Sequence, residues 1–115
     1  MSKKNKFETN AVHIGNEPDS STGSISPPIH LTSTYVQDGI GKNKGFDYSR
    51  GNNPTRQRLE QNIALLEGGY DAVAFSSGMA ATTALFQSLN QGDHVIISRN
   101  VYGGTYRMAT QVLSN

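Results

Sequence analysis

The chain has 115 residues, of which 35% are apolar and 17% are charged, so it can form one modest core and not two domains. Its formal net charge is +1 and its Lys and Arg residues are scattered, which argues against the continuous basic surface of a nucleic-acid-binding protein. It has no cysteine, no apolar stretch of the roughly 20 residues that span a bilayer and no apolar secretion signal, so we expect a cytoplasmic protein without disulfides, thiolate metal sites or membrane partners.

Residues 1–53 are predicted to form an extended, largely irregular arm. Residues 1–56 hold 13 apolar residues against 27 in residues 57–115, and no sustained helical or strand period joins them. Glycines and the pair Pro27-Pro28 interrupt the segment repeatedly. Because such a segment cannot build a core of its own, we expect it to lie on another surface, such as that of a neighbouring subunit.

A helix is predicted over residues 54–67. Asn53 is a good N-cap and Pro54 suits the first helical position. Apolar residues then recur at helical spacing, at Leu59, Ile63 and Leu66. The pair Gly68-Gly69 supplies a left-handed stop, which is typical of a helix end.

The following elements alternate between strands and helices. The apolar run 71–75 predicts a strand, which leads through a tight turn into a helix over residues 79–90. After a turn, the β-branched run 94–98 predicts a strand buried on both faces, and a third helix is expected after Gly103-Gly104. This order predicts an α/β fold with parallel strands and a right-handed crossover. Two strands are too few for a covered sheet, so the fold is expected to be truncated.

The junction Ser76-Ser77-Gly78-Met79 is the most informative candidate site. Free backbone N–H groups and the positive end of a helix dipole converge at such a junction, and glycine allows an anion to approach the backbone closely. The tetrapeptide therefore suits a phosphate group, while a capped helix start without a ligand is its simpler explanation when it is taken alone. It matches neither the P-loop nor the dinucleotide fingerprint.

Two further segments carry side chains suited to a ligand. Tyr48 and Arg50 on the arm can hold a phosphate through a phenol donor and a guanidinium fork, unless Tyr48 only packs and Arg50 is solvated. Tyr102 follows the second predicted strand, and ligands of open α/β sheets lie beside the carboxyl ends of strands, which puts Tyr102 and Gly78 near the same crevice. Its ring could stack there on a flat heterocycle or simply pack in a turn. The three histidines show no metal-ligand spacing, so no metal is expected.

Taken together, these segments resemble the Cys/Met-metabolism family of pyridoxal-phosphate enzymes, from Ala11 to Leu113. The motifs that match in order and spacing are Pro27-Pro28-Ile29, Thr32-Ser33-Thr34-Tyr35, Tyr48-Ser49-Arg50, Asn53-Pro54-Thr55, Leu66-Glu67-Gly68-Gly69, Ser76-Ser77-Gly78-Met79-Ala80-Ala81, Gly92-Asp93 and Val101-Tyr102-Gly103-Gly104-Thr105. The resemblance implies that residues 1–53 are an arm that contacts a neighbouring subunit. Residues 54–115 would begin the large domain of a pyridoxal-phosphate-dependent transferase of fold type I, similar to aspartate aminotransferase. The resemblance also implies a homotetramer built from dimers, which is the assembly of the family's members.

Carried over residue by residue, the resemblance implies four contacts to the cofactor phosphate. Tyr48 and Arg50 would reach from one subunit to the phosphate bound in the next. The backbone N–H groups of Gly78 and Met79 would bind the same phosphate. These contacts would explain an arm that has no core of its own.

The resemblance also implies contacts to the ring and the substrate. Tyr102 would stack on the pyridine ring and touch the substrate, and Arg107 matches a position that contacts the substrate carboxylate in cystathionine γ-lyase relatives. Pyridoxal phosphate is an electron sink, so the family eliminates or replaces a group at Cβ or Cγ of an amino acid. The implied activity is γ-elimination or γ-replacement on cystathionine or homoserine esters.

The lysine that binds the cofactor covalently in the family has no counterpart here. The five lysines all lie in the predicted arm, at Lys3, Lys4, Lys6, Lys42 and Lys44. Asp93 is the last acidic residue and belongs to a turn rather than to a site for the pyridine nitrogen. We therefore expect an N-terminal fragment that is inactive by itself, which borohydride trapping of a lysine-bound cofactor on the isolated chain would refute.

Alternatives remain open at this point. Gly104 stands where methionine γ-lyase relatives carry a cysteine, which favours cystathionine γ-lyase or γ-synthase, whereas Met79 does not separate the members. Cystathionine β-lyase and O-acetylhomoserine sulfhydrylase are the other members considered. A non-catalytic chain that acts only in assembly is a rival hypothesis. A small phosphate-binding domain that uses the Gly78 turn alone is a weaker one.

Overall fold

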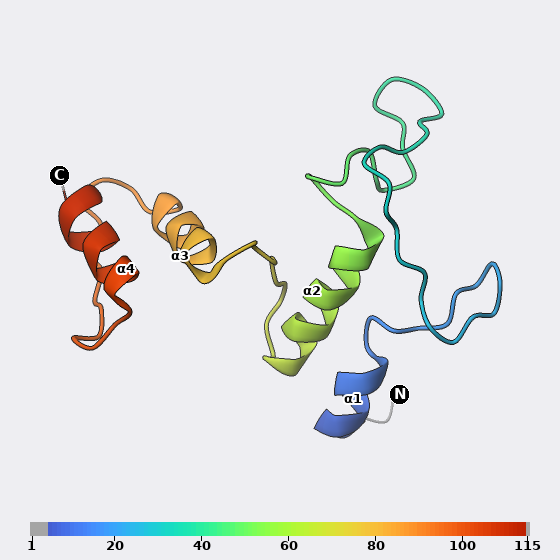
Figure 1. Cartoon of the computed structure of the whole chain (residues 1–115), viewed down its shortest axis with the longest axis horizontal. Coiled ribbons are helices and arrows are strands. Elements are labelled where there is room, and N and C mark those ends of the chain that lie inside the picture. The colour runs from blue at the N-terminus through green and yellow to red at the C-terminus, as the bar shows by residue number, and fades with distance from the viewer. Residues whose placement is uncertain (1–4, 115) are drawn as a thin grey trace. The chain divides into compact units, whose positions relative to one another are not determined.

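The computed structural model describes residues 5–114 and divides the chain into two compact units, with the boundary between Ala74 and Phe75. The helices, shown in Figure 1, are α1 (Phe7–His13), α2 (Pro54–Leu66), α3 (Gly78–Gln87), α4 (Gly103–Arg107) and the π-helical turn η1 (Met108–Val112). None of these helices combines the length and apolar character needed to cross a lipid bilayer. Helix α2 belongs to the first unit because it packs on α1. The predicted division into an arm of residues 1–53 and a domain from residue 54 stays a prediction.

Helix α2 begins and ends close to where the sequence predicts. The Asn53 side chain accepts a hydrogen bond from the Thr55 N–H at 2.8 Å, and Pro54 is the first helical residue. At the other end Gly68 has φ = +67°, a left-handed conformation that favours glycine. The predicted cap and stop signals are both confirmed.

Helix α1 lies within the segment that was predicted to be irregular, so that prediction is wrong for Phe7–His13. Seven residues are too few for a stable isolated helix. The side-chain amide of Asn62, on α2, donates to the carbonyl oxygens of Asn10, Ala11 and Ile14 at 3.3, 3.2 and 2.8 Å. The Asn10 carbonyl also accepts the Ile14 N–H at 3.0 Å, while the bonds to Ala11 and Ile14 satisfy carbonyls at the end of α1 that the helix itself leaves without a donor. A tertiary contact therefore stabilises α1.

Gly15 lets the chain leave α1 in close contact with α2. It is buried, has φ = +75°, and has no room for a Cβ, which would collide with the Arg58 carbonyl. The Arg58 guanidinium in turn donates to the carbonyl oxygens of Gly15 and Glu17, both at 3.3 Å. A glycine is therefore required where α1 meets α2.

Asp19 organises the turn that follows. Its carboxylate accepts hydrogen bonds from the hydroxyl groups of Thr22 and Ser21, at 2.6 and 2.7 Å. These bonds to the charged form lower the pKa of Asp19 from 3.8 to about 2. The carboxylate therefore stabilises the turn above its unfolded pKa, and this contribution is lost as the pH falls through about 2.

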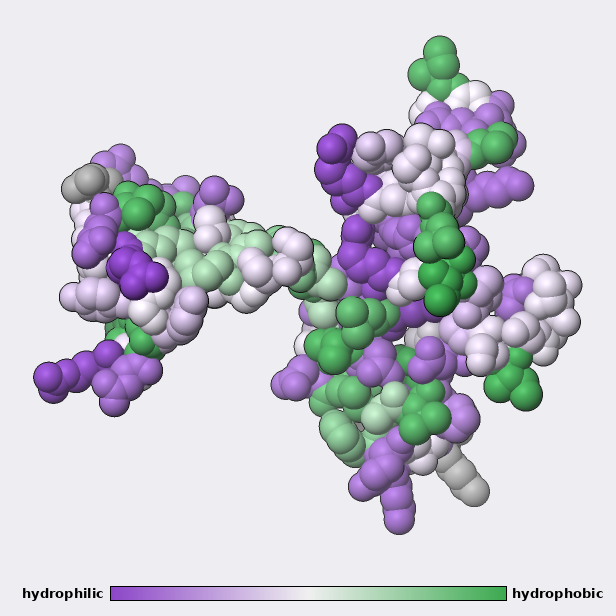
Figure 2. Space-filling model, viewed as in Figure 1, coloured by the Kyte–Doolittle hydropathy of each residue, from purple (hydrophilic) through white to green (hydrophobic). Residues whose placement is uncertain are grey.

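Between α1 and α2 the described chain is irregular, as predicted. Its only β-pairs are two isolated bridges, Thr34–Tyr48 and Gly39–Lys42. Apolar side chains on this stretch are 83% to 104% exposed, at Ile25, Leu31, Val36 and Ile40. Figure 2 shows hydrophobic residues at the surface of both units. Such exposure is unfavourable unless another surface covers these side chains.

The second unit is built from α3, α4 and η1. Helices were predicted over residues 79–90 and after Gly103-Gly104, and both are confirmed. Met108 is 8% exposed, and its Sδ accepts a hydrogen bond from the Thr83 hydroxyl at 3.2 Å. This contact attaches η1 to α3.

The two predicted strands are not formed in the described part of the chain. Residues 71–75 and 94–98 have no regular secondary structure, and residues 5–114 contain no strand ladder. A strand needs a neighbour that exchanges backbone hydrogen bonds with it. Within this chain the Ala74 N–H instead donates to the Glu60 carboxylate at 2.9 Å. The strands expected at these positions are therefore corrected to irregular segments, and the parallel sheet stays a prediction.

Candidate functional site

The start of α3 presents two unpaired backbone donors. The Ser77 hydroxyl accepts a hydrogen bond from the Ala80 N–H at 3.1 Å, and the Ser77 carbonyl accepts one from the Ala81 N–H at 3.1 Å. The N–H groups of Gly78 and Met79 have no acceptor within residues 5–114. Adjacent free donors at the positive end of a helix form a site that suits an anion.

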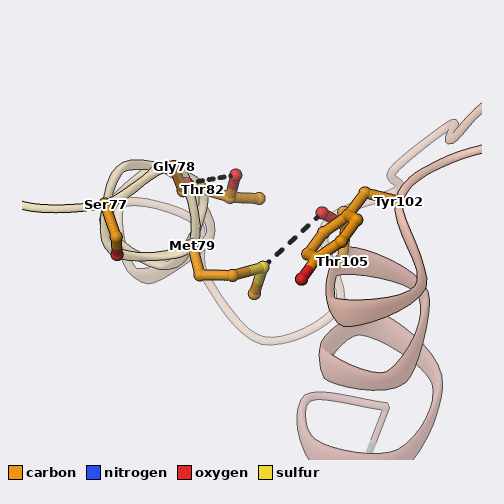
Figure 3. Close-up of a pocket in the computed structure, with 6 residues that line it drawn as sticks. All are labelled: Ser77, Gly78, Met79, Thr82, Tyr102 and Thr105. Carbon is orange, nitrogen blue, oxygen red and sulfur yellow. Dashed lines mark hydrogen bonds between the residues drawn. The ribbon is translucent and has the colours of Figure 1, made fainter.

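Gly78 and Met79, which carry these donors, line a cleft of about 490 Å³. It is lined by Ser77, Gly78, Met79, Thr82, Tyr102 and Thr105. Figure 3 shows the Met79 side chain extending from α3 toward Tyr102 and Thr105. Tyr102 is 70% exposed, so a flat ligand has access to this residue. The cleft thus brings Gly78, Met79 and Tyr102 together, as expected from their positions in the sequence.

Two lining residues, Thr82 and Thr105, were not predicted. The Thr82 hydroxyl donates to the Gly78 carbonyl at 2.9 Å, and the Thr105 hydroxyl lies 3.9 Å from the Met79 Sδ. Thr82 could have been found, because a residue four positions after Gly78 lies on the same helix face. Thr105 could not, because its place depends on how α4 packs on α3.

Gly104 makes room for the Tyr102 ring. A Cβ at this position would lie 2.7 Å from the Tyr102 Cε1 and 2.9 Å from the Met79 Sδ, closer than real contacts allow. At the neighbouring Gly103, a Cβ would meet only the Arg107 Nη1, at 3.4 Å. Of these two glycines, only Gly104 therefore limits where the Tyr102 ring and the Met79 side chain can lie.

Tyr48 and Arg50, the predicted phosphate contacts of the arm, lie in the first unit. The Arg50 guanidinium carbon is 4.9 Å from the centre of the Tyr48 ring, which is a cation–π contact. The Tyr48 carbonyl accepts hydrogen bonds from the N–H groups of Gly51 and Asn52, both at 3.0 Å. The two side chains are exposed and held together, so they can approach one anion jointly.

Arg107 does not line the cleft around Gly78. Its Nη1 lies beside Gly103, at the first turn of α4, and its side chain is exposed. The implied contact to a substrate carboxylate therefore stays a prediction. In the described part of the chain, no three His, Asp or Glu side chains lie close enough together to hold a metal ion.

A family model described as Cys/Met metabolism PLP-dependent enzyme matches residues 8–115. The chain belongs to this family. Cystathionine beta-lyase MetC of Bacillus subtilis is 50% identical over 115 residues, which are 99% of this chain and 30% of that protein. Cystathionine gamma-lyase of the same organism is 49% identical over 109 residues, 95% of this chain and 29% of that protein. The crystal structure of metB from Corynebacterium glutamicum aligns with a TM-score of 0.89 and 45% identity, covering 96% of this chain and 29% of that one.

This chain thus spans about 30% of the length of these relatives. The cofactor of the family is pyridoxal phosphate, which has an anionic phosphate and a flat pyridine ring. The residues of the cleft fit both parts. The free N–H groups of Gly78 and Met79 suit the phosphate, and the exposed Tyr102 ring suits the pyridine face.

If Tyr102 stacks on the cofactor, we expect Gly104→Ala to weaken pyridoxal-phosphate binding about three- to tenfold, because the new methyl group displaces the Tyr102 ring. The matched control is Gly103→Ala, which makes the same chemical change one residue earlier but has only a 3.4 Å contact to Arg107. Absorbance titration of both variants with the cofactor measures the difference. Equal affinities in the two variants would show that Gly104 does not position Tyr102.

Proposed function

We propose that this chain is the N-terminal part of a pyridoxal-phosphate-dependent trans-sulfuration enzyme. The enzyme would carry out γ-elimination or γ-replacement on cystathionine or homoserine esters, as a cytoplasmic homotetramer built from dimers. The observation that carries the proposal is the cleft at the start of α3, where two unpaired backbone donors and an exposed aromatic ring lie together.

In the proposed site each residue has a distinct role. The N–H groups of Gly78 and Met79 bind the cofactor phosphate, and the Tyr102 ring stacks on the pyridine. Tyr48 and Arg50 from a neighbouring subunit bind the same phosphate. In this arrangement the exposed arm lies on the surface of the other subunit. Two sources of charge compensation suit a dianionic phosphate better than backbone dipoles alone.

The substrate side of the site uses fewer residues of this chain. Tyr102 would also touch the substrate, and Arg107 would contact its carboxylate through a guanidinium fork. When bound, pyridoxal phosphate withdraws electrons from the substrate, so that a proton and a substituent at Cβ or Cγ can leave.

Neither a lysine for covalent attachment nor an acid for the pyridine nitrogen is available in the second unit. Every lysine precedes residue 45, and Asp93 accepts a hydrogen bond from the Asn90 N–H at 2.8 Å within its own turn. We therefore propose that residues 1–115 supply the phosphate site but do not turn over substrate alone.

The choice among family members rests on one position of this chain. Relatives named cystathionine gamma-lyase and beta-lyase match with similar identity, 49% and 50%, so overall similarity does not separate the two reactions. Gly104 favours cystathionine γ-lyase or γ-synthase over methionine γ-lyase. The alternatives within the family are the cystathionine β-lyase, methionine γ-lyase and O-acetylhomoserine sulfhydrylase activities.

Product analysis tests the proposed reaction. The intact protein, meaning the whole enzyme of which this chain is proposed to be the N-terminal part, is incubated with cystathionine, or with a homoserine ester in the absence of a thiol. The released keto acid is identified by mass spectrometry. Loss of the γ-substituent leaves a four-carbon keto acid, whereas β-elimination of cystathionine leaves pyruvate. We expect the four-carbon product, and pyruvate as the main product would contradict the γ-assignment while leaving the cofactor site intact.

A further inference from the structure

One guanidinium on α2, that of Arg56, binds two carbonyl groups of the loop that carries Tyr48 and Arg50. Arg56 Nη1 donates to the Ser49 carbonyl at 3.0 Å, and Arg56 Nη2 donates to the Gly51 carbonyl at 2.6 Å. The two acceptors lie on either side of Arg50 in the chain. Both carbonyl groups belong to a tight turn, where no regular strand or helix supplies a backbone N–H donor for them.

Glu60 fixes the orientation of this guanidinium. Its Oε1 lies 3.3 Å from the Arg56 Nε, one helical turn away, and also accepts the Ala74 N–H at 2.9 Å. The Glu60 side chain is 15% exposed and the Arg56 side chain 31%, so solvent screens this pair only in part. All three nitrogens of the guanidinium are therefore engaged, in three different directions.

The rest of the turn is fixed by hydrogen bonds that do not involve Arg56. The Ser49 N–H donates to the Ser33 carbonyl at 2.8 Å, and the Asn53 amide donates to the Ser49 hydroxyl at 2.9 Å. What Arg56 adds is a restraint on the carbonyls that flank Arg50. Ordering a flexible loop costs conformational entropy, so a turn that is ordered before binding leaves more of the binding energy for affinity.

We propose that Arg56, oriented by Glu60, is a positioning residue that preorganises Tyr48 and Arg50 for the cofactor phosphate. It touches neither the phosphate nor the ring, and it acts through the Ser49 and Gly51 carbonyls. The inference rests on the proposed function, because it takes the phosphate as the ligand of Tyr48 and Arg50.

The test compares Arg56→Lys with Arg58→Lys in the intact protein. A lysine keeps the charge but offers one ammonium in place of three divergent donors. Arg58 is a matched control on the same helix, since it too donates to loop carbonyls, but to those of Gly15 and Glu17. We expect Arg56→Lys to raise the Kd of pyridoxal phosphate about tenfold with kcat at saturating cofactor unchanged, and Arg58→Lys to change that Kd less than twofold.

A double variant separates positioning from general stability. If Arg56 acts only through the loop, Arg56→Lys in an Arg50→Ala, Tyr48→Phe background adds no further loss of affinity. Equal Kd values for Arg56→Lys and Arg58→Lys, or a full additive loss in that background, would overturn the proposal. Failure of Arg50→Ala itself to weaken binding would instead contradict the proposed function, so the two failures are distinguishable.

Discussion

Replacing Gly78 by proline is expected to weaken pyridoxal-phosphate binding about ten- to a hundredfold, because it removes one donor to a charged acceptor. Proline is well suited to the first position of a helix. The preceding residue, Ser77, has φ −157° and ψ 157°, the extended conformation that a following proline requires. Helix α3 should therefore keep its start and lose only the Gly78 N–H.

The control for this change is Gly78→Ala. It keeps the N–H and adds a methyl group that, apart from its chain neighbours and the backbone of its own helix, meets no described atom within 4 Å. Any loss in the alanine variant measures how closely the anion approaches, and the further loss in the proline variant measures the lost hydrogen bond together with the bulk of the proline ring. Cofactor titration by absorbance gives both values. Equal affinities of the proline and alanine variants would show that this N–H does not bind the phosphate.

Replacing Arg50 by alanine is expected to weaken cofactor binding about a hundredfold, since a guanidinium can make two charge-assisted hydrogen bonds to a phosphate. The change also leaves the Tyr48 ring without the cation that lies 4.9 Å from its centre. Tyr48→Phe removes only the phenol hydroxyl and should cost about tenfold or less.

Arg50→Lys is the control for charge. It keeps the positive charge and loses the planar fork, so its affinity should fall between those of the wild type and Arg50→Ala. Isothermal titration of cofactor-free protein with pyridoxal phosphate gives the three dissociation constants. A wild-type affinity in Arg50→Ala would show that Arg50 of the arm does not bind the cofactor phosphate.

The local signals of the sequence predicted most of the helices. The caps at Asn53 and Ser77 and the stop at Gly68 depend on neighbours only a few residues away, so they are readable from the chain itself. Helix α1 was missed because the bonds from Asn62 to its carbonyls join residues about fifty positions apart. No local pattern reports such a contact.

The strands and the details of the cleft could not be predicted for a related reason. The runs 71–75 and 94–98 have strand-like composition, but a ladder forms only where a neighbouring strand is present. Likewise, the residues around Gly104 predict a turn and a helix start, while the close contact that a Cβ there would make with the Met79 Sδ depends on the packing of another helix. The candidate phosphate donors were predictable because they follow from the geometry of a helix start.

In the proposed assembly, one cofactor phosphate is bound by α3 of one subunit and by Arg50 of another. Subunits carrying Arg50→Ala and subunits carrying Gly78→Pro are coexpressed with different tags, and the hybrid assemblies are purified. If the sites are shared, each hybrid dimer has one site with both lesions and one with neither, so about half of its sites should bind the cofactor with wild-type affinity. If every hybrid site binds as weakly as the single variants, the two groups belong to the same subunit and the account is contradicted.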